Sequence, residues 1–227
     1  MLWLSGCRVW TSVALIWCQY QRWRSCAWAG KHRLRWQPGS LDGPSRPEHQ
    51  MPPVVPPIIQ TKRLNLRPLE ENDLGDVVRI VGDYAVSQWL VPVPHPYTRD
   101  NADQFFAAVQ TGDLGFIWAL VLDGRFVGLI GAGPALGYWL CPSVWGLGLM
   151  TEAAQAVVDA FFHHTNEPAL SSSYFVGNHG SAQVLKRIGF LDQGPGQSFS
   201  QAQNKSVPTR EMLLTRARWV ALTASEA

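Results

Sequence analysis

The chain has 227 residues, of which 46% are hydrophobic and 16% are charged. This composition is typical of a folded globular protein and excludes disorder throughout, and the length suffices for one domain with a core plus an extension. Residues 1–50 hold seven Lys and Arg against two acidic residues, so the rest of the chain has 12 basic and 15 acidic residues and a net charge of −3. Such a domain has no basic surface for a nucleic-acid partner, and we expect none.

The first 50 residues differ in character from the rest of the chain. Six of the eleven tryptophans lie within residues 3–36, among arginines and without a helical or strand period. The most apolar run, residues 9–18, is about half as long as the roughly 20 residues that a membrane-spanning helix needs, so we expect no membrane association. Met51 would make a natural start. We therefore expect residues 1–55 to be an extension that is disordered or wrongly assigned to the protein, with a targeting segment, a membrane or partner anchor and a small accessory element as alternatives.

Cysteine usage indicates a reducing compartment. Three of the four cysteines lie in the N-terminal segment, and Cys141 is alone in the rest of the chain. A single thiol forms no disulfide within the domain, so we expect a cytoplasmic location.

From residue 58 onward the pattern becomes regular. Residues 58–68 alternate apolar and polar side chains and predict a strand that ends at a proline. Residues 74–81 follow the apolar spacing of a helix. A second helix begins after Thr98, a good N-cap, and carries its apolar stripe over residues 102–109.

The middle of the chain predicts three consecutive antiparallel strands within residues 116–141. Asp123-Gly124 lies between two apolar runs and is the favoured signal for a two-residue hairpin. Gly133-Pro134 marks a second reversal of the chain.

Helices and strands alternate after this meander. A third helix carries an apolar stripe over residues 154–162, a strand follows at 169–176, and a short helix spans 178–190. Residues 209–219 predict the last strand, with residues 197–201 as its antiparallel neighbour.

The order of these elements predicts the fold class. We expect a mixed α/β (α+β) fold in one domain, residues 56–222, followed by a tail at 223–227. Its centre would be a mostly antiparallel, twisted sheet of about six to seven strands, flanked by four helices.

Residues 145–150, "WGLGLM", form a glycine-rich turn between the last strand of the meander and the third helix. The first amides of a helix lack intrahelical partners and its dipole places positive charge there, so this turn is suited to bind a phosphate or pyrophosphate. Gly146 and Gly148 would let the backbone approach such an anion closely. The turn is neither a G-x-x-x-x-G-K-[ST] loop nor a G-x-G-x-x-G loop.

Two motifs together resemble one known family. The segments "GYWLCPSVWGLGLMTEA" (137–153) and "NHGSAQVLKRIGF" (178–190) resemble the GNAT superfamily of acyl-CoA-dependent N-acetyltransferases, and more narrowly its ribosomal-protein N-terminal (Rim-type) branch. The early "TKRLNLRPLEENDL" and the closing "LLTRARW" are similar to that branch as well. The resemblance covers residues 58–222 and implies a GNAT-like fold whose strands splay apart where acetyl-CoA, the co-substrate, binds.

The resemblance also implies cofactor-binding residues. The pantetheine arm of acetyl-CoA would lie between the strand that ends at Leu140 and Cys141 and the strand at 170–176. Asn178 would contact the pantetheine, and Ser181 would lie near the thioester sulfur. The pyrophosphate would be held by the backbone of six consecutive residues: Trp145, Gly146, Leu147, Gly148, Leu149 and Met150.

Two positions depart from the loop pattern of the family. Met150 stands where a small Ala is usual, and Ser143 stands where other branches place Arg or Gln. Because neither departure removes a backbone donor, we expect acetyl-CoA binding to be kept.

The reaction implied by the resemblance is direct attack of an amine on the acetyl thioester. Many relatives place a Glu base where this chain has Ala135, and a Tyr acid where it has Leu185. Ser181 is then the candidate to protonate the leaving thiolate, although an ordinary serine in the first turn of a helix explains the residue equally well. Glu152 is one candidate base, or simply a carboxylate that favours the start of the third helix.

The missing Glu bears on the acceptor. At pH 7 about a tenth of α-amines with a pKa near 8 are neutral, against less than about a thousandth of lysine side chains. We therefore expect a protein N-terminal α-amine or a small-molecule amine as acceptor, with a non-catalytic acyl-CoA-binding regulatory module as the alternative. Trp89, His95 and Tyr97 are candidates to bind the acceptor, or they simply pack. The histidines form no ligand cluster, so no metal is expected. For the oligomeric state, we expect either a monomer or a homodimer.

Overall fold

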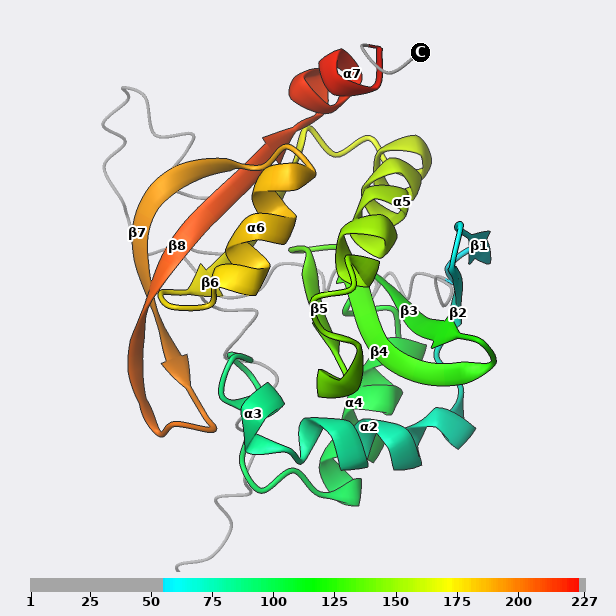
Figure 1. The fold of residues 1–227 in the computed structure, drawn as a ribbon, viewed down its shortest axis with the longest axis vertical. Helices are drawn as coiled ribbons and strands as arrows, with labels where there is room; N and C mark the ends of the chain where they lie inside the picture. The colour runs from blue at the N-terminus through cyan, green and yellow to red at the C-terminus, as the bar shows by residue number, and fades with distance from the viewer. Residues whose placement is uncertain (1–54, 225–227) are drawn as a thin grey trace, which may run out of the picture. The chain divides into compact units, whose positions relative to one another are not determined.

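The structure, a computed structural model, describes residues 55–224. The expected N-terminal extension and most of the expected tail lie outside the described residues. The mixed α/β fold with antiparallel strands is confirmed. The described strands form two sheets, of five and three strands, rather than the one central sheet of about six to seven strands that was expected, and Figure 1 shows the helices packed around both. The first sheet has the strand order β1 (Ile59–Gln60), β2 (Leu64–Pro68), β3 (Phe116–Leu122), β4 (Arg125–Ala132) and β5 (Gly137–Leu140). In the second sheet β8 (Lys205–Thr215) lies between β6 (Ala169–Phe175) and β7 (Leu191–Ser200).

The strand predicted at residues 58–68 is instead a hairpin. The chain bends at Lys62 and Arg63, and β1 pairs antiparallel with β2. The Thr61 amide donates to the Leu64 carbonyl oxygen at 2.9 Å and closes the bend. Four polar residues in a row, 60–63, interrupt the alternation that a continuous strand needs. The bend carries Thr61 and Arg63 out of the sheet.

The hairpin predicted at Asp123-Gly124 is confirmed. Both residues have positive φ angles, 48° and 74°, as a two-residue type I′ turn requires. Leu122 and Arg125 form the first pair of β3 with β4 beyond the turn.

Within residues 55–224, four helices correspond to the four predicted ones, and two short helices were not predicted. Asp83 caps the first of these, since its side chain accepts a hydrogen bond from the Ala85 amide. A 3-10 turn at Glu71–Asp73 precedes α2 (Leu74–Val81), and another at Pro142–Val144 precedes α5 (Leu149–His164). The helices are α2 (Leu74–Val81), α3 (Tyr84–Ser87), α4 (Arg99–Gln110), α5 (Leu149–His164), α6 (His179–Arg187) and α7 (Arg216–Ala224).

The C-terminal prediction was wrong in its boundaries. The last strand ends at Thr215 rather than at residue 219, and its neighbour β7 begins at Leu191 rather than at residue 197. The chain leaves the sheet because the next residues pack on the end of α5. Arg216 donates to three carbonyl oxygens there, and the Trp219 indole donates to the Asp159 carboxylate at 2.6 Å.

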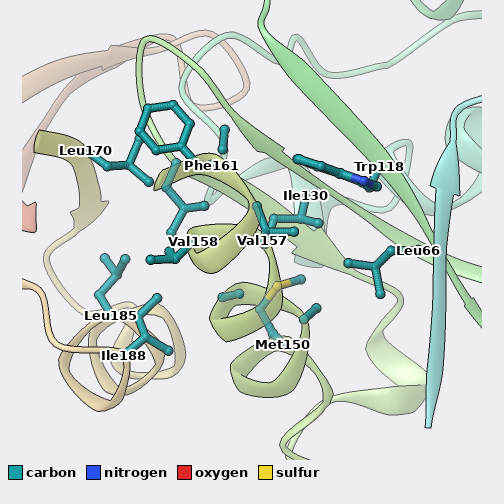
Figure 2. Packing of buried hydrophobic residues seen from close by; sticks show 14 of the residues in the cluster. Leu66, Trp118, Ile130, Met150, Val157, Val158, Phe161, Leu170, Leu185 and Ile188 are labelled. Carbon is teal, nitrogen blue, oxygen red and sulfur yellow. The ribbon is translucent and has the colours of Figure 1, made fainter. Parts of the chain in front are cut away.

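Helix α5 is the centre of the larger hydrophobic core. Figure 2 shows its buried side chains, Met150 and Val157 among them, against Leu66, Trp118 and Ile130 of the first sheet. On the other side α5 contacts α6 through Leu185 and neighbouring residues. Helices α2 and α4 cover the opposite face of the first sheet with a second cluster. The start of α5 packs next to β5 in this core, since Leu140, Leu149 and Met150 all belong to it.

Strands β5 and β6 belong to different sheets, so no ladder pairs them. They are joined just before β5 begins, where the Leu136 amide donates to the Ser171 carbonyl oxygen and the Ser172 hydroxyl donates to the Leu136 carbonyl oxygen, both at 2.8 Å. The strands part beyond this junction, as the expected splay requires.

Candidate active site

The turn before α5 is shaped by two glycines with left-handed backbone angles. Gly146 has a φ of 77° and Gly148, the N-cap of α5, has a φ of 75°. In that backbone conformation a residue with a β-carbon would destabilise the fold by about 1–2 kcal/mol. No atom lies within 4 Å of where a β-carbon at Gly146 would stand, so this side of the loop is open. The glycines are needed for the backbone path rather than for space.

Six consecutive backbone amides in this loop are unpaired. Among the hydrogen bonds of residues 55–224, none is donated by the amides of residues 146–151. The first paired amide is that of Glu152, which donates to the Gly148 carbonyl oxygen at 3.2 Å. Unpaired amides at the start of a 16-residue helix favour an anion through both hydrogen bonding and the helix dipole.

The side chains of the loop divide between solvent and core. Trp145 and Leu147 are exposed, whereas Leu149 and Met150 are buried. Figure 2 shows the Met150 side chain within the core, below Leu66. Met150 therefore offers only its amide to a ligand, so its departure from the usual small residue changes the core and not the loop surface.

The Trp145 indole crosses toward β5 and donates to the Leu140 carbonyl oxygen at 2.8 Å. Leu140 itself is buried, and the neighbouring Cys141 is half-buried with its sulfur 3.2 Å from the Ser143 hydroxyl. Cys141 is a free thiol, and direct transfer to an amine needs no cysteine nucleophile.

The start of α6 brings two predicted residues together. Asn178 caps the helix, and its side-chain oxygen accepts from the Ser181 amide at 3.1 Å. Sequence reasoning missed Tyr138 of β5, whose hydroxyl donates to the Ser181 carbonyl oxygen at 3.2 Å across the parting of β5 and β6. Burial raises the pKa of the Tyr138 phenol, so it stays a hydrogen-bond donor at neutral pH.

The three candidate acceptor-binding residues lie in or near the segment after α3, but in different surroundings. Trp89 lies beside the turn between β6 and α6, with a ring atom 3.9 Å from where a β-carbon at Gly177 would stand. The His95 ring contacts Tyr84 edge to face, with centroids 5.1 Å apart, and its Nδ1 is 3.4 Å from the Ser87 hydroxyl.

Tyr97 packs against the second hydrophobic cluster. Burial raises its pKa to about 12. Of the three, Trp89 therefore lies beside the turn that leads to Asn178 and Ser181, whereas the ring of Tyr97 is taken up by packing.

Sequence reasoning also missed a polar cluster behind the glycine loop. The Thr61 hydroxyl and the Arg63 amide both donate to Glu152 Oε1, at 2.6 and 2.8 Å, and Arg63 Nε donates to Oε2 at 2.7 Å. Burial alone would raise the pKa of Glu152, but the bonds from Thr61 and Arg63 outweigh it and hold the pKa below its ordinary value. An ionised, fully bonded carboxylate is a poor proton acceptor, so Glu152 is an anchor rather than a base.

Two negative findings concern the described part of the chain. Residues 55–224 contain no group of three or more His, Cys, Asp or Glu arranged to hold a metal ion. None of the helices described has the length and apolar character that crossing a membrane requires.

Comparison with known proteins places this site in context. The family model described as "Acetyltransferase (GNAT) domain" matches residues 63–191. YdaF of Bacillus subtilis (strain 168), which carries the provisional name of a ribosomal N-acetyltransferase, is 25% identical over 147 residues, covering 59% of this chain and 80% of YdaF.

Solved structures share the fold. The spermidine N-acetyltransferase of Vibrio cholerae, in complex with CoA and spermine, has a TM-score of 0.61 at 15% identity, covering 70% of this chain and 98% of that one. The Salmonella typhimurium acetyltransferase that modifies the N-terminal serine of ribosomal protein L7/L12 has a TM-score of 0.60 at 16% identity, with the same coverage of 70% and 98%.

Proposed function

Because the chain belongs to the GNAT family of acetyltransferases, we propose that it acetylates the N-terminal α-amine of a protein. Membership of the family establishes the coarser function: an N-acetyltransferase, which is an acyltransferase that takes its acetyl group from acetyl-CoA and gives it to an amine. The identity of the amine and the roles of individual residues form the proposal.

The assignment of the acetyl-CoA site rests on the six unpaired amides of residues 146–151. They would bind the pyrophosphate of acetyl-CoA, supported by the dipole of α5. The pantetheine would follow the edge of β5 near Leu140 and Cys141, and Asn178 and Ser181 would lie on its other side. The acetyl thioester would then reach the junction at Leu136, where β5 and β6 begin to part.

In the reaction the neutral amine nitrogen attacks the thioester carbonyl carbon and the carbon–sulfur bond breaks. The amine loses one proton, and the coenzyme A thiolate takes one up to leave as the free thiol. We assign thiolate protonation to the Ser181 hydroxyl, which would give its proton to the sulfur and take up the proton that the amine loses. The start of α6, capped by Asn178, holds Ser181 in place. Trp89 is proposed to line the acceptor side, with His95 and Tyr97 farther along the same segment.

A protein N-terminus suits this site because the position of the usual Glu base is Ala135 and Glu152 is bonded as an anchor. The α-amine has the lower pKa and needs the least help to lose its proton. The names of YdaF and of the Salmonella enzyme support the same choice. The free thiol of Cys141 supports a reducing, cytoplasmic location.

A small-molecule amine is the second candidate. The spermidine N-acetyltransferase of Vibrio cholerae shares the fold, and its named substrate is a polyamine. That likeness is one of fold at low sequence identity. Spermidine is therefore included in the experiment as an alternative acceptor beside the peptides.

An amine panel tests the proposal. Release of free thiol from acetyl-CoA would be followed with a lysine-free peptide that has a free N-terminus, the same peptide with a blocked N-terminus and one lysine, and spermidine. We expect the free N-terminus to have a kcat/KM at least about tenfold above the lysine peptide, because its neutral fraction at pH 7 is more than about a hundredfold larger. Equal or faster turnover of the lysine peptide or of spermidine would overturn the assignment of the acceptor.

A further inference from the structure

The bend between β1 and β2 contacts the loop that precedes α5 from behind. Arg63 divides its donors between two partners: Nε and the backbone amide bond Glu152, and Nη1 donates to the Leu147 carbonyl oxygen at 2.7 Å. Its Nη2 lies 3.7 Å from where a β-carbon at Gly148 would stand. One guanidinium thus links the start of the domain to the middle of the loop.

The bond to Leu147 fixes which way an amide points. The peptide between Leu147 and Gly148 is trans, and in a trans peptide the carbonyl oxygen and the following N–H point in opposite directions. Because Arg63 binds the oxygen, the N–H of Gly148 is turned away from Arg63. Glycines with left-handed φ angles lie on both sides of Leu147, so without Arg63 this peptide plane has more freedom to rotate.

The bond to Glu152 removes an unfavourable charge. Glu152 lies in the first turn of α5, within the same helix end as the unpaired amides, and its side chain is 18% exposed. A lone carboxylate there would repel a phosphate group. Arg63 neutralises it at 2.7 Å, and the Thr61 hydroxyl fixes its other oxygen.

We propose that Arg63 is a positioning residue for acetyl-CoA: it aims the Gly148 amide through the Leu147 carbonyl and neutralises Glu152 beside the pyrophosphate. This rests on the proposed function, since it takes residues 146–151 as the pyrophosphate site. Thr61 supports Arg63 by holding Glu152 in place.

The test compares a donor that has phosphates with one that has none. The Kd for CoA would be measured by calorimetry for Arg63→Ala, Arg63→Lys, Glu152→Gln and the double variant Arg63→Ala/Glu152→Gln. Turnover would be measured with acetyl-CoA and with S-acetylpantetheine, which lacks the pyrophosphate. Arg99→Ala is the matched control, because Arg99 forms a similar ion pair with Asp103 at 2.8 Å on the surface of α4, which covers the face of the first sheet opposite α5.

For Arg63→Ala we expect a Kd for CoA about tenfold higher, or about 1.4 kcal/mol, because a charged hydrogen-bond donor is lost and a carboxylate is exposed. The double variant should recover part of this loss, because it no longer has the carboxylate charge. Arg63→Lys keeps the charge without the forked geometry and should lie between the wild type and Arg63→Ala. Turnover of S-acetylpantetheine by Arg63→Ala should stay at the wild-type value. The control variant should keep the wild-type Kd for CoA and the wild-type turnover with both donors.

Two results would overturn the role of Arg63. The first is a Kd for CoA in Arg63→Ala that stays within about twofold of the wild type. The second is an equal loss with S-acetylpantetheine, which would mean that Arg63 only stabilises the fold. A wild type that uses both donors equally well would instead contradict the pyrophosphate site itself, so the two failures are distinguishable.

Discussion

Replacing Gly148 by Asp and by Asn gives a direct test of the anion site, because the two variants differ in charge and hardly in shape. Gly148 has a φ of 75°, a conformation that Asp and Asn enter more readily than other residues with a β-carbon. The new β-carbon would have one neighbour, Arg63 Nη2 at 3.7 Å, which is an ordinary contact. Both variants should therefore fold and keep the Gly148 amide.

The size of the difference depends on the charge. With about 5 Å between the Asp carboxylate and a phosphate charge, and an effective dielectric constant between about 80 and 20, the repulsion is about 0.8–3.3 kcal/mol. That corresponds to a roughly 4- to 250-fold higher Kd for CoA in the Asp variant than in the Asn variant. Because the Asp would also approach the Arg63 guanidinium, we expect a value near the lower end.

Calorimetric titration of both variants with CoA would measure the ratio, first at about 0.1 M salt and then at about 1 M, where screening shortens the Debye length to about 3 Å. The ratio should shrink with salt. Equal affinities of the Asp and Asn variants at low salt would refute the conclusion that an anion lies against this loop.

Three further predictions concern Met150, Glu152 and Ser181. Met150→Ala should lower the free energy of unfolding by about 2–5 kcal/mol, measured with urea, because the side chain is buried between α5 and the first sheet. The pKa of the Glu152 carboxylate is held below its ordinary 4.5. Its ionised form should therefore stabilise the fold at higher pH, and this stabilisation should be lost as the pH falls through the lowered pKa. In a plot of Tm against pH, Glu152→Gln should lack this part of the decline in Tm at acid pH. Ser181→Ala should lower kcat by about a hundredfold if the hydroxyl protonates the thiolate, with an unchanged Kd for CoA, because the backbone bonds to Asn178 and Tyr138 are kept. An unchanged kcat would reduce Ser181 to an ordinary helix residue.

The elements with local signals were predictable from the sequence. The glycine loop, the start of α5 and the Asp123-Gly124 hairpin each depend on a few neighbouring residues whose backbone preferences are strong. The separation of β5 from β6 was predicted only from the resemblance to a family. The residues of one strand carry no signal about a neighbouring strand with which they do not pair.

The missed features depend on contacts between distant parts of the chain. Arg63 is an unremarkable polar residue until the fold brings it beside Leu147, 84 positions away. The polar run at residues 60–63 was the available signal for the bend. Helix α7 replaces the predicted end of a strand because Trp219 and Arg216 find partners on α5, which no local pattern indicates.

The contacts that hold the two ends of α5 have a practical consequence for the design of shorter fragments of this chain. Thr61 and Arg63 hold the first turn of the helix, and Arg216 and Trp219 hold its last turn. The segment that matches the family model, residues 63–191, contains only one of these four residues and omits β8 altogether. A fragment cut to that segment would keep the recognisable motifs and lose the residues that hold the helix between them, so an expression fragment should extend at least from β1 through α7.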